Sequence, residues 1–220
     1  QKHKNANSVQ QVIEEAISKI LKNPVTINGC GRTDTGVSAC QFFFHIDIEK
    51  QWDFDLKFRL NRLLPNDIAV FDIIEMQGLP HARFDATQRT YNYFIHTEKN
   101  PFLDLTSSFY QLKSLDIEKM NRAVALLPKY NDYRSFCTTP DKNAHTICHV
   151  SQAELYIDPS GKRIRFMVSS NRFLSKMIRI LTGKLLKIGT GKLSLEEFEN
   201  HLITLETPKT LIRPGKTRLR

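Results

Sequence analysis

Apolar side chains recur along the first half of the chain at spacings that alternate between helical and extended periods. A helix is predicted over 9–21, because Ser8 and Gln11 have the spacing of a capping box and Asn23-Pro24 marks an end. A second helix and several extended segments follow. They are expected as strands over 25–31, 40–48 and 68–76 and as a helix over about 54–64, with Phe54, Phe58 and Leu60–Leu64 facing inward.

The second half of the chain repeats this alternation. Its elements are expected as strands over 87–97, 153–157 and 163–169 and as helices over 116–127, 173–188 and 194–205. The turn composition of Asp158-Pro-Ser-Gly161 predicts a hairpin between the last two strands. From Pro208 onward the chain is expected to be irregular.

Helices and strands mix without a strict strand–helix–strand repeat, and several neighbouring strands look hairpin-connected. This pattern favours an α+β fold with a largely antiparallel sheet over a doubly wound parallel sheet. The order helix, strand, loop, strand, helix, strand recurs, so we expect two similar α+β subdomains, over residues 1–80 and 81–220.

The net charge of +9 is concentrated at one end of the chain. From Gly161 to Arg220 there are 14 Lys and Arg against 4 Glu and no Asp, whereas the first 160 residues hold 18 basic and 19 acidic residues. A charge that served solubility alone would be spread more evenly. The concentration therefore favours a polyanionic partner, and nucleic acid above a membrane.

Other features of the composition point to a cytoplasmic protein. No apolar run approaches the roughly 20 residues that span a bilayer, and the polar N-terminus lacks the apolar core of a signal peptide. The four cysteines are too few and too scattered for a disulfide framework, so a reduced compartment is expected.

The densest chemical signal is the segment Gly29–Ala39, which has three glycines in eight residues between two apolar strands. Such a loop takes unusual backbone angles or lies against a ligand, and it contains Arg32 and Asp34. The phosphate-loop pattern with its Lys is absent. From the pattern alone, a plain hairpin with both charges solvated is an equally good interpretation.

A second cluster of chemically reactive residues consists of Cys137, His145, Cys148 and His149. These are zinc-ligand types, but they lack a pair of cysteines two to four residues apart. No metal and no cofactor are expected.

The Gly-rich loop also carries a family resemblance. Gly31-Arg-Thr-Asp34-x-Gly-Val resembles the active-site loop of the TruA-type tRNA pseudouridine synthases. Further segments resemble this family in the same order along nearly the whole chain. They are His81–Tyr91, Asp132–Cys137 and Phe173–Arg179 continuing to Gly183.

The resemblance implies two ferredoxin- or RRM-like halves that share one sheet, with the active site in the cleft between them. It implies an isomerase that converts uridine to pseudouridine in the anticodon stem-loop of tRNA, at tRNA positions 38, 39 and 40, without a cofactor. It further implies a homodimer with tRNA lying across both subunits. Compared with the family, the chain begins at the Gln of a Gly-Trp-Gln segment and ends before a last apolar strand, so an incomplete sheet is expected.

The resemblance assigns the role of nucleophile to Asp34, which attacks either the uracil or the sugar. Arg179 corresponds to the Arg that stabilises this carboxylate by a charge-assisted hydrogen bond. Tyr91 corresponds to the Tyr that stacks on the uracil and serves in proton transfer at C5, and Arg32 to a residue that holds the flipped nucleotide. Thr35 and Ser38 replace the Ala and His that are usual in this loop.

The pattern leaves other interpretations of these residues open. Tyr91 shares a strand face with Tyr93 and can be a core residue, and Arg179 can belong to a basic helix stripe with Arg172, Lys176 and Lys187. RNA-backbone contacts are expected at Arg83, Arg89, Arg172, Lys176 and Lys187. The rival functions are a non-catalytic RNA-binding module of the same fold and a phosphate-handling enzyme, and the latter lacks a metal-binding carboxylate motif.

Overall fold

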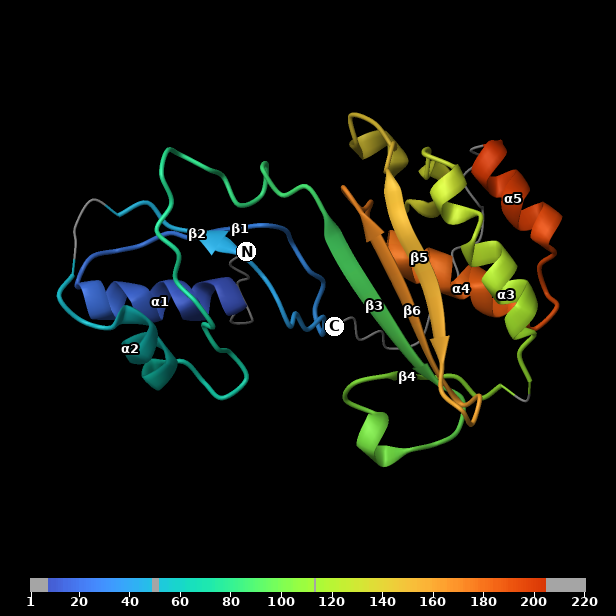
Figure 1. Cartoon of the computed structure of the whole chain (residues 1–220), viewed down its shortest axis with the longest axis horizontal. Coiled ribbons are helices and arrows are strands. Elements are labelled where there is room, and N and C mark those ends of the chain that lie inside the picture. The colour runs from blue at the N-terminus through green and yellow to red at the C-terminus, as the bar shows by residue number, and fades with distance from the viewer. Residues whose placement is uncertain (1–7, 49–51, 113, 205–220) are drawn as a thin grey trace. The chain divides into compact units, whose positions relative to one another are not determined.

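The computed structural model describes residues 8–48, 52–112 and 114–204, and its elements are labelled in Figure 1. Contacts divide the chain into two compact units. The first holds the residues up to Thr33 together with Gln41–Ala86, and the second holds Asp34–Cys40 and the residues from Thr87 onward. The sequence predicts a boundary after residue 80, whereas contacts place it after residue 86 and assign the Asp34 segment to the second unit.

The first unit is built on two helices, α1 (Val9–Leu21) and α2 (Leu56–Leu63). Ser8 caps α1 by accepting from the Gln11 amide at 3.2 Å, but the Gln11 side chain bonds Glu15, so this capping box is only half formed. The side chains buried between the two helices and the adjacent segments of the same unit form a small apolar core. They are Ile13, Ala16, Ile17, Ile27, Leu56, Leu60, Leu64 and Val70.

The inward orientation predicted for Phe58 and Leu63 of α2 is wrong, since these residues are 58% and 45% exposed. Leu56, Leu60 and Leu64 recur every four residues and occupy the buried face. Phe58 lies halfway around the helix from this row, where the Arg62 guanidinium covers its ring at 5.8 Å.

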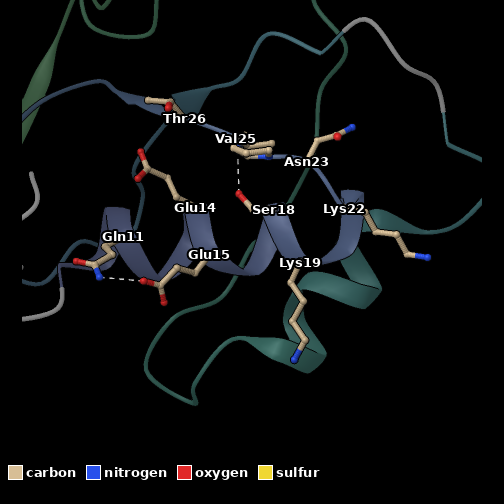
Figure 2. Close-up of a pocket in the computed structure, with 10 residues that line it drawn as sticks. Gln11, Glu14, Glu15, Ser18, Lys19, Lys22, Asn23, Val25 and Thr26 are labelled. Carbon is tan, nitrogen blue, oxygen red and sulfur yellow. Dashed lines mark hydrogen bonds between the residues drawn. The ribbon is translucent and has the colours of Figure 1, made fainter.

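Two short antiparallel strands, β1 (Asn28–Gly29) and β2 (Phe44–His45), complete the assigned elements of the first unit. Both are much shorter than predicted. At β1, side chains of α1 accept hydrogen bonds from the backbone amides that would extend the strand. The Val25 amide donates to Ser18 Oγ at 2.9 Å, which Figure 2 shows, and the Ile27 amide donates to Glu14 Oε1 at 3.1 Å.

The strand predicted over 68–76 is wrong. Asn61 of α2 takes both backbone groups of Val70, donating to its carbonyl and accepting from its amide at 2.8 Å each. The Asn61 side chain thus makes the two backbone hydrogen bonds that a neighbouring strand would otherwise make with Val70. Beyond Val70 the apolar side chains face solvent, with Phe71 76% exposed.

The second unit contains a four-stranded sheet in the order β4-β3-β6-β5. Its strands are β3 (Arg89–His96), β4 (Ser108–Phe109), β5 (Val150–Ile157) and β6 (Arg163–Ser170). β4 runs parallel to β3, and the remaining pairs are antiparallel, including the predicted β5–β6 hairpin. The α+β class with a largely antiparallel sheet is therefore confirmed.

Three helices, α3 (Ile117–Val124), α4 (Met177–Gly189) and α5 (Leu195–Ile203), lie along one side of this sheet (Figure 1). Ser194 and Glu197 form a complete capping box at the start of α5. Short 3-10 helices connect the elements, at Pro101–Leu103, Leu127–Lys129, Arg134–Phe136 and Pro140–Lys142. Tyr93, Phe166, Leu181 and Phe198 are fully buried between sheet and helices.

Helix α4 begins four residues later than the sequence predicts. Lys176, its N-cap, has a left-handed backbone with φ +60°, and the Met177 amide bonds the Leu174 carbonyl at 3.1 Å. A left-handed residue interrupts helical geometry, so Phe173 and its neighbours form a loop instead of a first turn.

None of the helices in these described ranges is long and apolar enough to cross a membrane.

Candidate active site

Asp34 opens a tight turn that is anchored in the second unit. Its carbonyl accepts from the Val37 amide at 3.2 Å, and Gly36 at the third position has φ +79°. This left-handed conformation is strained for residues with a Cβ, which gives one glycine of the loop its physical reason. The Val37 side chain packs against the core of the second unit. The turn and the packing of Val37 therefore fix the backbone position from which the Asp34 side chain projects.

Arg179 approaches the same carboxylate from helix α4. Its neighbours Ile178 and Ile180 are buried, which fixes the orientation of the first turn. The Arg179 Nη2 atom lies 3.0 Å from Asp34 Oδ2. The Arg179 side chain is 24% exposed, whereas the Asp34 side chain is 58% exposed. The pair thus consists of a largely covered guanidinium and an accessible carboxylate.

This geometry suits a carboxylate that acts on an incoming ligand. A charge-assisted hydrogen bond from a held guanidinium stabilises the anion and restricts its orientation. Since more than half of the Asp34 side chain is reachable by solvent, a substrate can reach it as well. The carboxylate can serve as a nucleophile or as a proton acceptor.

Tyr91 lies on β3, with its ring half-buried against the core. Phe173, in the loop before α4, meets it edge-on, with ring centroids 4.9 Å apart and planes at 89°. This is a preferred geometry for aromatic pairs. Phe173 was part of the family motif but received no role from the sequence, because only the tertiary structure brings it against Tyr91.

Asn171 fixes the loop that carries Phe173, a role that no sequence pattern indicates. The amide of His149 donates to Asn171 Oδ1 at 2.8 Å, and Arg89 Nη1 donates to the Asn171 carbonyl at 2.7 Å. Further along the loop, Thr138 and Ser175 bond through their side chains at 3.3 Å. The loop between β6 and α4 is therefore held at both ends.

The predicted basic stripe on α4 is wrong for two of its members. Arg172 and Lys176 precede the helix, so they do not share a helical face with Arg179 and Lys187. Arg172 instead contacts the ring of His145, and Lys176 is exposed at the start of α4.

One basic residue near the end of the chain, Lys184, is buried and adds nothing to a charged surface. Its Nζ lies 2.8 Å from His201 Nδ1 and 5.1 Å from the ring centroid of Phe136. Burial, together with the nearby charge of Lys187, lowers the pKa of Lys184 to about 8.

Two predicted residues, Arg32 and Arg83, lie in the first unit and are exposed. The Arg83 amide bonds His81 Nδ1 at 3.1 Å, and its guanidinium lies 5.9 Å from the ring centroid of Phe84. Arg32 lies two residues before Asp34 in the sequence, with Thr33 between them.

The cysteines and histidines considered as zinc ligands do not converge. Cys137 and Cys148 are buried in the core, whereas His145 and His149 are exposed. Burial raises the pKa of the Cys148 thiol to about 11, which disfavours a thiolate ligand. Within the part of the chain that the structure describes, no three Cys, His, Asp or Glu residues are grouped to hold a metal ion. None of Cys30, Cys40, Cys137 and Cys148 forms a disulfide.

Two hollows in the structure contain none of the predicted site residues. One, of about 550 Å³, runs along α1 and the segment after it, and Figure 2 shows its polar lining with Glu14, Glu15, Lys19 and Lys22. The other, of about 430 Å³, lies beside the sheet of the second unit and includes Phe94 and Tyr156.

The sequence is similar to proteins of one family over most of its length. Residues 130–214 match the family model described as tRNA pseudouridine synthase. The chain is 40% identical over 201 residues to tRNA pseudouridine synthase A of Porphyromonas gingivalis, covering 89% of this chain and 79% of that protein. It is 41% identical over 200 residues to the same enzyme of Parabacteroides distasonis, covering 89% and 77%. The Streptococcus pneumoniae enzyme is 31% identical over 203 residues, covering 90% and 81%.

Proposed function

Since the chain belongs to the tRNA pseudouridine synthase A family, a family of isomerases, we propose that it converts uridine to pseudouridine in tRNA, with Asp34 as the nucleophile. The observation that carries this proposal is the ion pair of Asp34 with Arg179. It joins a turn and a helix that lie far apart in the sequence. These two elements also carry the segments that resemble the active-site motifs of the family.

The reaction requires few groups from the protein. The bond between C1′ and N1 of the uridine breaks, the uracil turns, C1′ bonds to C5, and the C5 proton leaves while N1 ends protonated. Substrate and product are isomers, so neither a redox partner nor a transferred group enters. In this proposal Asp34 forms a transient bond to the nucleotide, at the uracil ring or at C1′, and leaves when C1′ has bonded to C5.

Arg179 keeps the Asp34 carboxylate oriented and compensates its charge before attack and after departure. Tyr91 stacks on the uracil, and its hydroxyl serves in proton transfer at C5. A half-buried ring braced by Phe173 is suited to this task, because it offers a surface that cannot easily turn away. Arg32 holds the nucleotide out of its stack, since the reacting base must leave the helix of a stem-loop.

The finer features of the proposal follow the family. The substrate is the anticodon stem-loop of tRNA, the working form is a homodimer with tRNA across both subunits, and the fold consists of two ferredoxin-like halves. Basic groups contact the RNA backbone, drawn from the exposed Arg83 and Lys176 and the half-buried Arg89, Arg172 and Lys187. We expect a cytoplasmic enzyme, in keeping with four cysteines of which none forms a disulfide.

The direct test is to incubate the purified protein, with no added cofactor, with an unmodified tRNA transcript that carries uridines in its anticodon stem-loop. Pseudouridine is then mapped by carbodiimide modification and primer extension. We expect pseudouridine on the 3′ side of this stem-loop and nowhere else. A protein that binds the transcript but leaves every uridine unchanged would be an RNA-binding module of the same fold, contrary to the proposal.

A further inference from the structure

Arg172 and His145 form a close pair of basic side chains on the surface of the second unit. Arg172 Nη1 lies 3.0 Å from Nε2 and 3.3 Å from Nδ1 of His145. Because Nη1 is close to both ring nitrogens, the guanidinium lies across the imidazole ring and does not donate to one nitrogen alone. A guanidinium carries five N–H donors, so most of its hydrogen-bonding capacity is directed elsewhere.

The two segments that carry this pair are fastened to each other on both sides of it. On one side, Asn171 and His149 exchange bonds, from the His149 amide to Asn171 Oδ1 at 2.8 Å and from the Asn171 amide to the His149 carbonyl at 3.3 Å. On the other side, Thr138 bonds Ser175. Arg172 and His145 are consequently held together before any ligand arrives.

Two acidic residues of the segment that carries His145, Asp132 and Asp141, bond other groups. Asp132 Oδ1 accepts from the Arg134 amide and from Thr146 Oγ1. Asp141 is ion-paired with Arg134. Among the residues that the structure describes, no carboxylate lies within ion-pairing distance of Arg172. Two basic groups in contact without a counter-charge provide a site that an anion can complete.

We propose that Arg172 and His145 together bind one backbone phosphate of tRNA, and that His145 takes up a proton when the phosphate binds. The inference rests on the proposed function, which supplies tRNA as the ligand. Arg provides the geometry for phosphate oxygens, and an imidazolium next to it becomes favourable only when an anion offsets the repulsion. Binding at this point is therefore coupled to protonation.

Other charged or titratable groups lie in the segments that carry Arg172 and His145, and they decide which residue serves as the control. Arg172 faces His145 from the loop before α4, and Asp132, Cys148 and His149 belong to the segment before or at the start of β5 that carries His145 itself. The pKa of Cys148 is raised to about 11, so this thiol does not titrate near neutrality. His149 is also exposed, and its ring bonds Asn131 Oδ1 at 3.3 Å instead of Arg172. It is the matched control.

The test measures affinity for an unmodified tRNA transcript over about 50 to 300 mM KCl, at about pH 6 and about pH 8. We expect the wild type to bind several-fold more tightly at the lower pH. His145→Gln should remove this difference, whereas His149→Gln should keep it. Arg172→Gln should weaken binding about five- to tenfold and reduce the log–log salt slope by about one, while Arg172→Lys should retain the slope.

Arg122→Gln, which removes an exposed charge of α3, is the control for net charge and should change affinity by less than about twofold. Thermal unfolding of each variant establishes that it is folded. The inference is overturned if folded Arg172→Gln keeps the wild-type slope, or if His149 rather than His145 carries the pH dependence. These experiments measure binding, so they test the inference separately from the proposed function. If the wild type makes pseudouridine but the variants bind tRNA as the wild type does, only the phosphate site is refuted.

Discussion

Asp34 and Arg179 form an ion pair in which the arginine is the more buried partner, at 24% exposure against 58% for the aspartate. Exposed ion pairs contribute little to stability, since solvent screens them and both side chains must be ordered. The Arg179 guanidinium is therefore better explained as a fixed support for an accessible carboxylate than as a stabilising contact. This relationship between the two residues leads to the first prediction.

Arg179→Ala should reduce the single-turnover rate at saturating tRNA by about a hundredfold or more, because the carboxylate loses the group that orients it. The affinity for tRNA should fall by less than about fivefold. Arg179→Lys should restore charge without the planar geometry and recover only part of the rate. A variant that lost affinity alone, with an unchanged saturating rate, would make Arg179 a phosphate contact.

The edge-on contact of Tyr91 with Phe173 gives a second prediction. Phe173→Leu should lower the single-turnover rate roughly tenfold by freeing the Tyr91 ring, with little change in affinity. In a Tyr91→Ala background, where no ring remains to be positioned, the same substitution should have almost no further effect on the rate. Rate losses that multiplied in the double variant would mean that Phe173 acts independently of Tyr91.

Much of the second unit could be predicted from its sequence, and much of the first could not. The β3 pattern with Tyr91 and Tyr93 on one face and the Ser194 cap are local signals, and the structure reproduces them. The segment over 68–76 has strand composition, but the Asn61 side chain takes the Val70 backbone groups. No local pattern records such a tertiary contact.

The candidate site shows the same division between local and tertiary information. The glycines of the loop before Val37 predicted an unusual backbone, and Gly36 adopts one. The Asp34–Arg179 pair depends on how a turn meets a helix, and no sequence periodicity carries that information; only the family resemblance suggested it. The fastening of the loop by Asn171 was missed because a lone Asn between a strand and a helix is unremarkable in sequence.

The packing of α4 against α3 makes a prediction about stability. A Cβ on Gly189 would lie 2.5 Å from Met120 Sδ and 2.8 Å from Leu115 Cδ2, which is closer than atoms can approach. Gly189→Ala should therefore destabilise the protein by about 1–3 kcal/mol, measured by urea unfolding. Gly31→Ala is the control, since a Cβ there meets nothing within 4 Å. Equal stability of the two variants would contradict the close packing.

The buried Lys184 makes stability depend on pH in a defined direction. An unfolded lysine keeps its proton up to about pH 10.5, whereas folded Lys184 releases it above about 8. Between these values the unfolded chain binds more protons, so the contribution of Lys184 to stability rises with pH. Lys184→Met should exceed the wild type by roughly 1–3 kcal/mol near pH 7, and this advantage should shrink as the pH rises.

The comparison is made by thermal unfolding at about pH 7 and about pH 9.5. Lys192→Met, which alters an exposed lysine, should track the wild type at both values. An advantage of Lys184→Met that stayed constant between these pH values would show that folded Lys184 keeps its proton as the unfolded lysine does, contrary to the lowered pKa.

The central claim, that Asp34 is the nucleophile, is tested most directly by tritium release from tRNA labelled at C5 of uridine. Asp34→Asn removes the charge and the nucleophile while keeping the size and most of the hydrogen bonding of the side chain. We predict that release falls by at least about a thousandfold, with affinity for tRNA within about threefold of the wild type and unchanged thermal unfolding. Substantial tritium release by folded Asp34→Asn would contradict the account.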